Sequence, residues 1–190
     1  MGSGGVGSAS GGVQRPLAAR VSADPLAHRK SDRLLTRTIQ DVTVVLLGLL
    51  AGAMLLIAVA FVGYWQSLEP EAFLAWFATH AHRIGGLMVP LGATATAAAI
   101  VSAGVSWRIG GSVRAWALTS AALAVLVVVV YFAAHAPRNT VFAARSVAPG
   151  NVSRELGTWA AWHWVRVVLG IGAFYTQLLS IRGKDTSRAS

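Results

Sequence analysis

The chain alternates between long apolar stretches and short polar connections. The apolar stretches cover residues 42–64, 84–105, 115–135 and 158–180. Each has the length of about 20 residues that an α-helix needs to cross a hydrocarbon core of about 30 Å. Strands with open edges cannot satisfy their backbone hydrogen bonds in lipid. The pattern therefore predicts an all-α membrane protein, a bundle of four transmembrane helices.

The polar ends of the chain predict two tails. Residues 1–38 begin with a Gly- and Ser-rich run and continue as a basic stretch, so we expect a disordered basic tail here. Residues 39–181 then form the transmembrane domain, and residues 182–190 form a second, short tail.

One connection carries an amphipathic pattern of its own. In residues 69–80, which join the first two apolar stretches, Phe73, Trp76, Phe77 and His80 recur at helical spacing. An aromatic stripe of this kind is typical of a helix that lies flat at the membrane surface. We therefore predict a short interfacial helix, either as an anchor or as a lid over a lateral opening for an apolar substrate.

The basic residues predict the orientation. Eleven of the 16 Lys and Arg residues lie in the two tails and in the connection between the second and third apolar stretches. The other two connections hold four, and Arg166 lies inside the last stretch. Because cytoplasmic flanks carry the excess of Lys and Arg, we expect a multi-pass protein of the cell membrane, plasma or inner, with both termini cytoplasmic.

Composition supports a membrane protein and excludes other classes. The 190 residues are 55% hydrophobic and 12% charged, which is about half the charge of a soluble domain. The net charge of +9 could suit nucleic acid, but the basic residues flank apolar stretches as topology signals do, so we expect the lipid bilayer and no nucleic acid as partner. The absence of cysteine excludes disulfides and thiolate chemistry.

Small residues predict close packing of the helices. Gly48 and Gly52 form a GxxxG pair in the first apolar stretch. Small residues let two helix backbones approach each other in lipid. The pair favours packing within one bundle over a seam between two copies, and the oligomeric state stays open.

Polar and aromatic side chains gather at the end of the predicted bundle that lies away from the termini. In the last apolar stretch, Trp159, His163 and Arg166 share one helix face, and Trp162 adjoins that face. A charge as deep as Arg166 costs at least about 2.5 kcal/mol at mid-bilayer, so it normally faces a wet cavity or a partner. The other segments bring further candidates to the same end: His80, Arg83, Tyr131, His135 and Asn139.

Non-enzymatic interpretations of this polar end remain open. Arg166 could extend to the lipid headgroups while the tryptophans form an interfacial belt. Alternatively, Arg83, Arg138 and Arg166 could bind a lipid headgroup or a partner membrane protein, which would make the chain an accessory protein.

A histidine-ligated metal site is another alternative. His80 or His82, together with His135 and His163, would supply three imidazoles from different segments, a set that Zn, Cu or Fe accepts. No HxxxH or ExxH spacing supports such a site. We therefore expect no cofactor and keep the metal site as an alternative.

Four stretches within residues 42–180 carry a family resemblance. They are residues 64–73 (YWQSLEPEAF), 88–91 (MVPL), 137–139 (PRN) and 159–166 (WAAWHWVR). Together they resemble a small four-helix membrane family that includes the anthrone oxygenases. The sharpest element is the closing Trp-His-x-x-Arg.

The resemblance implies a reaction and a role for several residues. Anthrone oxygenases convert an activated methylene between aromatic rings into a carbonyl. By this resemblance His163 is the base that removes the acidic proton, and Arg166 is the cation that holds the resulting enolate, which passes electrons to O2 without a cofactor. Trp159 and Trp162 supply flat walls for an apolar aromatic substrate. The remaining candidates contribute to the same binding site: Asn139, His135, Tyr131, His80 and Arg83.

Overall fold

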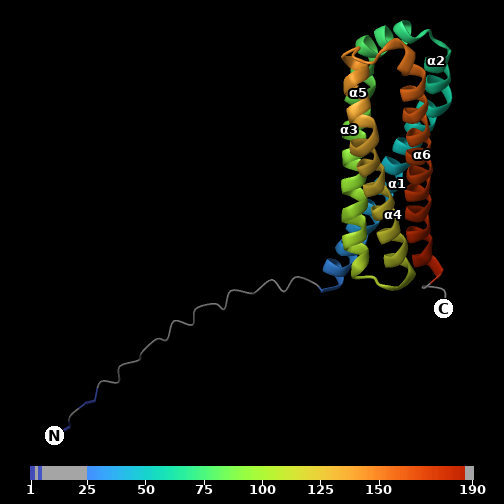
Figure 1. Cartoon of the computed structure of the whole chain (residues 1–190). Helices are drawn as coiled ribbons and strands as arrows, with labels where there is room; N and C mark the ends of the chain where they lie inside the picture. Colours follow the sequence, from blue (N-terminus) through green and yellow to red (C-terminus); the bar gives the residue numbers. More distant parts are fainter. Residues whose placement is uncertain (3, 6–24, 187–190) are drawn as a thin grey trace.

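The computed structural model describes residues 1–2, 4–5 and 25–186, and within these residues all regular structure is helical (Figure 1). The two η elements are single π-helical segments, each of which continues the helix before it. The elements form four long rods: α1 (Pro25–Leu56) with η1 (Ile57–Phe61) and α2 (Val62–Ser67); α3 (Pro70–Trp107); α4 (Gly111–Val130) with η2 (Tyr131–His135) and α5 (Ala136–Ala143); and α6 (Pro149–Thr186).

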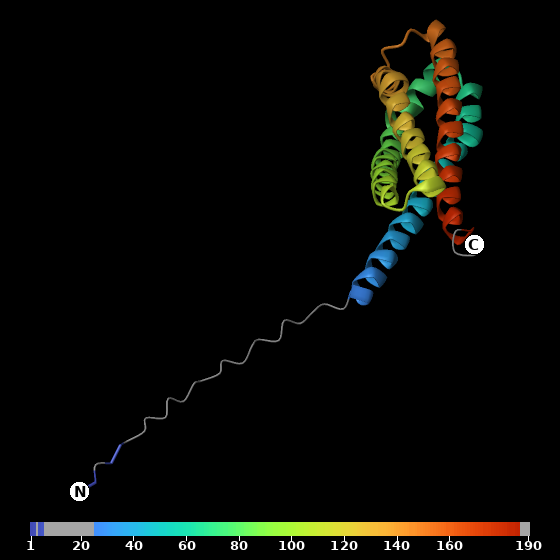
Figure 2. The same cartoon turned by 90° about the horizontal axis from the view of Figure 1, so that it is seen from below.

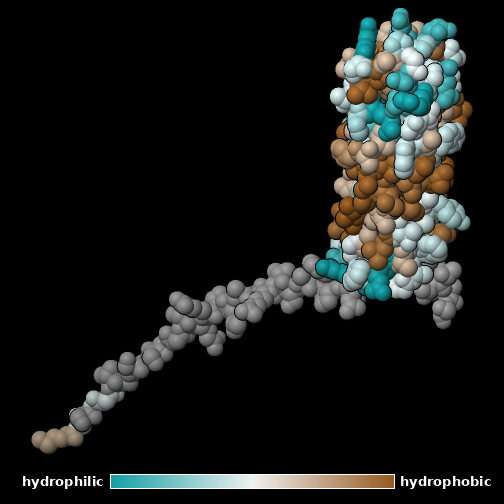
Figure 3. All heavy atoms as spheres, in the orientation of Figure 1, coloured by the Kyte–Doolittle hydropathy of each residue, from teal (hydrophilic) through white to brown (hydrophobic). Residues whose placement is uncertain are grey.

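The rods run up, down, up and down, so the start of α1 and the end of α6 lie at the same end of the bundle (Figure 1). Hydrophobic residues form a belt across the middle of the face in Figure 3, and hydrophilic residues gather at both ends. The structure thus confirms the predicted all-α bundle of a multi-pass membrane protein. Four ranges are long and apolar enough to cross a membrane: Lys30–Ser67, Pro70–Trp107, Gly111–Ala143 and Pro149–Arg182.

The helices extend well beyond the apolar stretches. The 38 residues of α3 span about 57 Å, compared with a hydrocarbon core of about 30 Å, so the bundle projects from the bilayer. At the N-terminal side α1 begins at Pro25, so the prediction of disorder is wrong for residues 25–38, and residues 3 and 6–24 of the predicted tail lie outside the described residues. Proline suits a first helical position, and the residues after it contain no further Gly or Pro before the apolar stretch. At the other end α6 reaches Thr186, so residues 182–186 are helical as well.

The predicted interfacial helix is not a separate element. Residues 70–80 are the first turns of α3 and continue directly into the span. The first Gly or Pro after Pro70 is Gly85, at the start of the apolar stretch, so nothing ends the helix within residues 71–84. Phe73 and Phe77 pack against Trp65 of α2, with ring centroids 6.2 and 5.8 Å apart, instead of facing lipid. The gain from burying these rings against another helix favours the long rod.

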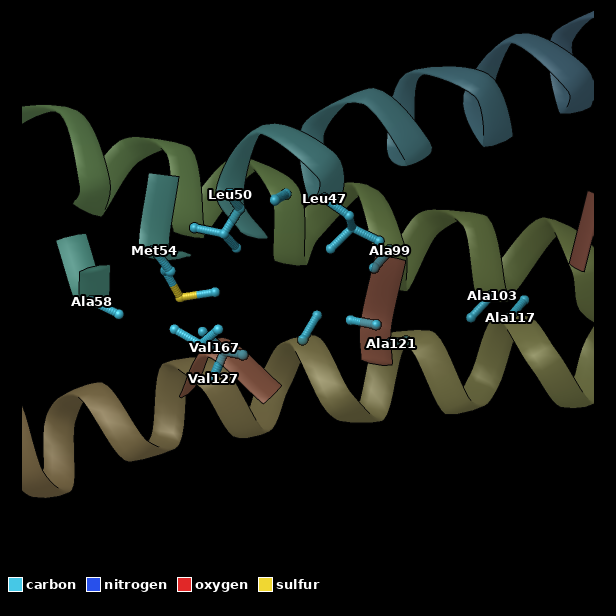
Figure 4. Close-up of a cluster of buried hydrophobic side chains, with 13 residues drawn as sticks. Leu47, Leu50, Met54, Ala58, Ala99, Ala103, Ala117, Ala121, Val127 and Val167 are labelled. Carbon is cyan, nitrogen blue, oxygen red and sulfur yellow. The ribbon is translucent and has the colours of Figure 1, made fainter. Parts of the chain in front are cut away.

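The core of the half nearer the termini combines small and large residues. Alanines of α3 and α4 face one another, among them Ala99 and Ala121 (Figure 4). Leu47, Leu50 and Met54 project from α1 into the space that these small residues leave (Figure 4). The prediction that small residues allow close packing is confirmed for this part of the bundle.

Buried polar side chains connect the same helices. The Nε2 of Gln40 donates to the Oγ of Ser106 at 3.0 Å, and the Nε2 of Gln177 donates to the Oγ of Ser102 at 2.8 Å. Because lipid tails are as apolar as the side chains of the helices, interhelical hydrogen bonds contribute to helix association in membranes. We call these two bonds the polar seam; it joins α1 to α3 and α3 to α6.

The glycines at helix contacts have different surroundings. A Cβ on Gly48 would lie 3.2 Å from the Phe174 ring, whereas a Cβ on the exposed Gly52 would meet nothing within 4 Å. Gly48 therefore packs within the bundle, and Gly52 does not. On α6, a Cβ on Gly170 would collide with the terminal methyl of the fully buried Met54.

Gly170→Leu should destabilise the bundle by about 1–3 kcal/mol, because the added carbons need the space that the Met54 methyl occupies. Gly52→Leu is the matched control, since its side chain has open space around it. The measurement is the melting temperature of both variants in detergent. A Gly170→Leu protein that melts no lower than Gly52→Leu would show that this contact is not tight.

Candidate functional site

A cavity of about 510 Å³ lies in the half of the bundle away from the termini, between α3, the rod of α4, η2 and α5, and α6. This volume suits a single small organic ligand. Most of the wall is apolar, from residues such as Ile57, Phe77 and Met88. The polar and aromatic part of the wall includes Tyr131, His135, Asn139, Trp159, His163 and Arg166.

The mouth of the cavity faces the side of the bundle. Two of its lining residues, Val89 on α3 and Phe132 on η2, are 50% and 66% exposed. Both lie in ranges that are apolar enough to cross a membrane. An apolar compound dissolved in the bilayer could therefore enter between α3 and η2 without passing through water.

Both π-helical segments contribute to the cavity wall. Ile57 belongs to η1, and Tyr131 and His135 belong to η2. A π-helical turn inserts one residue into an α-helix and is often found at functional sites. Residues that follow the inserted residue therefore lie on a different face of the helix than they would in an uninterrupted α-helix. The sequence analysis missed both segments, because nothing in IAVAF or YFAAH distinguishes a π-helical turn from an α-helical one.

The protonation of His163 follows from its one hydrogen bond. The ring is 1% exposed, and its Nε2 lies 3.0 Å from the backbone oxygen of Met54. A carbonyl oxygen can only accept, so Nε2 carries a proton. In the neutral ring the lone pair is then on Nδ1, which is buried and has no hydrogen-bond partner among the described residues. His163 thus presents an unoccupied basic nitrogen.

Aromatic contacts fix the imidazole in place. The ring of Trp159 stacks on His163, with centroids 4.8 Å apart and planes 18° apart. The indole N–H of Trp159 donates to the Oδ1 of Asn139 at 2.8 Å, which ties α6 to α5. Residues four apart on a helix share a face, so this stack is built into the sequence of α6.

His135 adds two more nitrogens without partners. Its ring is 1% exposed and lies edge-on to Trp159 at 4.8 Å and 5.8 Å from the His163 ring. Neither nitrogen makes a hydrogen bond of good geometry within the described chain, although the backbone of Val130 is close enough to interact. Buried polar atoms are nearly always hydrogen-bonded in native proteins, so this ring needs a water or a ligand.

Arg166 is a buried cation without a carboxylate partner. It is 9% exposed, and its guanidinium carbon lies 5.3 Å from the centre of the Tyr131 ring. The ion pairs among the described side chains join Arg138 and Arg154 to Glu155, and none of them involves Arg166. The aromatic face compensates only in part for lost hydration. An anionic ligand would supply the missing counter-charge.

The unsatisfied atoms are concentrated at the cavity. In the part of the chain that the structure describes, seven buried side-chain nitrogen or oxygen atoms lack a hydrogen-bond partner. Five of them belong to cavity-lining residues, namely Trp65, His135, His163 and Arg166. This concentration identifies the cavity as the candidate binding site.

Three predicted site residues lie elsewhere. Trp162 is 44% exposed and is absent from the cavity wall, because one residue before His163 corresponds to a turn of about 100° around the helix. His80 is exposed and stacks on Trp76 of its own helix, whose carbonyl oxygen its Nδ1 contacts at 2.9 Å. Arg83 is exposed and does not line the cavity. These three are corrections to the sequence analysis, whereas the other six predicted residues meet in one site.

Trp65 is a wall residue of the cavity that the sequence pattern did not predict. Trp65 is buried, lines the cavity and lies edge-on to Trp159, with centroids 5.5 Å apart. Its aromatic character was visible in the sequence, but its direction was not. The preceding η1 shifts the helical phase by one residue, so spacing along the first helix could not predict the face on which Trp65 lies.

The residues of the two alternative sites, the histidine metal site and the three-arginine headgroup site, do not come together in the structure. His82, His135 and His163 all line the cavity, but the described side chains of residues 30–182 include no group of three or more His, Asp or Glu close enough to hold a metal. Arg83, Arg138 and Arg166 do not form a common headgroup site either. Arg138 pairs with Glu155 at 3.4 Å and does not line the cavity.

Fold and site together define the class: a multi-pass four-helix membrane protein with a buried polar cluster in a side-opening cavity. Comparison of the chain with protein-family models, curated proteins and solved structures found no match. The resemblance to the anthrone oxygenases therefore stays a prediction.

Asn139→Leu should lower stability by about 1–3 kcal/mol, because the largely buried indole N–H of Trp159 loses its acceptor. Asn139→Asp keeps an acceptor oxygen at the same position and should recover most of the loss. Asn151→Leu, at an exposed position of α6, is the control. Melting temperatures in detergent test the bond, and equal values for the Leu and Asp variants at Asn139 would contradict its importance.

Proposed function

We propose that this protein is a membrane-bound oxidase that acts on an apolar aromatic compound with an acidic C–H bond, in the manner of anthrone oxygenases. One observation carries the proposal: an unoccupied basic nitrogen of His163 and the unpaired cation of Arg166 line the same cavity. A base removes a proton, and a nearby cation stabilises the anion that forms. The cavity supplies both.

The cavity favours a flat, apolar substrate. Its wall is mostly apolar, and the exposed Val89 and Phe132 at its mouth would contact lipid. The rings of Trp159 and Tyr131 in the wall suit an aromatic compound, because aromatic rings make favourable edge-on or offset contacts with one another. A phenolic oxygen would be placed against Arg166, the charge without a carboxylate partner in the described chain.

The proposed reaction converts one activated methylene group and one molecule of O2 into one ketone and one molecule of water. His163 Nδ1 takes one methylene proton, and Arg166 stabilises the resulting enolate. The enolate gives one electron to O2, and the substrate radical and superoxide combine to form a C–O bond. The imidazolium returns its proton to the outer oxygen of the peroxide. Loss of the second C–H proton to His163 then breaks the O–O bond, and the released hydroxide takes that proton to become water.

Burial of the site strengthens this chemistry. A charge interaction is several times stronger in a low-dielectric cavity than in water. His163 is also held by the Met54 carbonyl and by the Trp159 ring, so Nδ1 keeps its direction throughout the reaction. Fixed groups of this kind need little reorganisation as charge develops, which is the main source of electrostatic catalysis.

His163→Gln should lower turnover by about 10²-fold or more, because glutamine can still donate to the Met54 carbonyl but cannot act as a base. Substrate binding should change little. The measurement is O2 uptake by the purified protein with a hydroxyanthrone as test substrate. His80→Gln, which changes an exposed histidine outside the cavity, is the matched control and should keep full activity.

Arg166 variants form the second arm of that experiment. Arg166→Lys keeps the charge but loses the planar fork, so it should retain more activity than Arg166→Met, which removes the charge. Arg83→Met is the control for loss of an exposed arginine outside the cavity. A stable and fully active Arg166→Met protein would refute the proposed site. It would favour an accessory role in which this arginine only reaches toward the headgroups.

We further propose that the termini are cytoplasmic in the cell membrane and that the cavity lies in the opposite half of the bundle. The basic residues of the α3–α4 connection and of the tails support this orientation. Ser112→Cys and Ser153→Cys place single thiols at exposed positions of the two ends. In intact cells an impermeant maleimide should label only the second. Labelling of the first alone would reverse the orientation.

A further inference from the structure

A second hollow, of about 930 Å³, lies at the end of the bundle that carries the termini. Its walls come from α1 (residues 32–40), from the last turns of α3 and the residues after it (101–109), and from Ile181 of α6. Figure 2 shows the first turns of α1 projecting away from the other three rods, which opens this space. None of the functions considered above uses it.

The hollow lies at the level where the membrane core ends. The polar seam joins Gln40 to Ser106 at 3.0 Å, and the hydroxyl of Thr43, which lies 2.7 Å from the carbonyl oxygen of Ile39 in its own helix, is also within 3.2 Å of the carbonyl oxygen of Ala98. These bonds hold α1 against α3 where the apolar stretches stop, close to Val105. Beyond this level the two helices separate, and their side chains become polar and basic. The hollow therefore spans the boundary between hydrocarbon and headgroups.

Three arginines give the hollow a positive rim. Arg33 and Arg37 of α1 and Arg108 after α3 line it, and the single acidic residue in its wall is Asp32. None of the three arginines makes an ion pair with the side chains that the structure describes, those of residues 30–182. Guanidinium groups bind phosphate through paired N–H donors, so an excess of them at a membrane surface favours an anionic phosphate ester.

The floor of the hollow is apolar. Val101, Val105 and Ile109 of the α3 side face Leu35 and Ile39 of α1 across it. Gly104 contributes no side chain, and a Cβ there would meet no atom within 4 Å, so the floor is open next to Arg108. A small soluble anion would leave this apolar surface exposed.

We propose that this hollow binds an anionic phospholipid of the leaflet at the termini, with its phosphate between the arginines and an acyl chain along the apolar floor. The charge favours an anionic over a neutral headgroup, and the floor favours a lipid over a free phosphate. The arginines that orient the chain then also hold one lipid against α1 and α3. The site is independent of the oxidase chemistry in the opposite half.

Native mass spectrometry of the full chain, in detergent with equal amounts of dioleoylphosphatidylglycerol and dioleoylphosphatidylcholine, tests the proposal. The native protein should retain dioleoylphosphatidylglycerol in preference to dioleoylphosphatidylcholine. Arg37→Gln and Arg108→Gln should each lower that retention about fivefold. Arg114→Gln is the matched control, since Arg114 lies at the same end but over the Trp107 ring, outside the hollow.

A steric variant tests the floor without changing charge. Gly104→Leu should fill the apolar part of the hollow and lower retention as well, with the melting temperature of lipid-free protein confirming that the variant is folded. Equal retention of the two lipids by the native chain would overturn the proposal. So would equal losses in all three arginine variants, which would indicate general surface attraction, or unchanged retention in Gly104→Leu. Displacement by an equal concentration of inorganic phosphate would assign the arginines to a free anion instead.

Discussion

The structure depends on one constraint, which is that a polar group inside a bilayer must find its partner within the protein. The half of the bundle nearer the termini largely meets this constraint, with hydrogen bonds such as those of Gln40 with Ser106 and of Gln177 with Ser102; among the described residues of this half, one buried side-chain atom, the Oε1 of Gln177, has no partner. The other half does not meet it. There His135, His163 and Arg166 are buried with atoms that have no partner in the described chain, and all three line one cavity.

This contrast separates a half whose buried polar groups are mostly paired from the half that holds the candidate site. Paired side chains and closely packed alanines stabilise the first half. The second half is destabilised by buried polar groups that only a ligand or water can satisfy. The connection between the halves is Met54. Its side chain fills the core against Gly170, and its carbonyl oxygen accepts a hydrogen bond from the Nε2–H of His163. The position of the proposed base is therefore set by the packing of the core.

The two hollows also differ in the partner that their chemistry favours. The cavity opens sideways through Val89 and Phe132 and ends at a buried base and cation, which suits an apolar reactant that moves within the lipid. The hollow at the termini has exposed arginines above an apolar floor, which suits a resident phospholipid. Both proposals take the ligand from the membrane, at different depths.

The sequence by itself determined the class of fold and the identity of the central pair. Stretches of about 20 apolar residues leave no option but spanning helices, and a charge as deep as Arg166 requires a partner or a cavity. Helical spacing also placed Trp159, His163 and Arg166 on one face, because local geometry alone sets that face. Tertiary structure decided the rest. The π-helical segments shift the helical phase of two rods. Burial of Phe73 and Phe77 makes the predicted surface helix part of α3. Only packing decides that Trp162 faces outward while Trp65 faces the cavity. These outcomes depend on contacts between segments far apart in the chain, and periodicity within one segment carries no information about them.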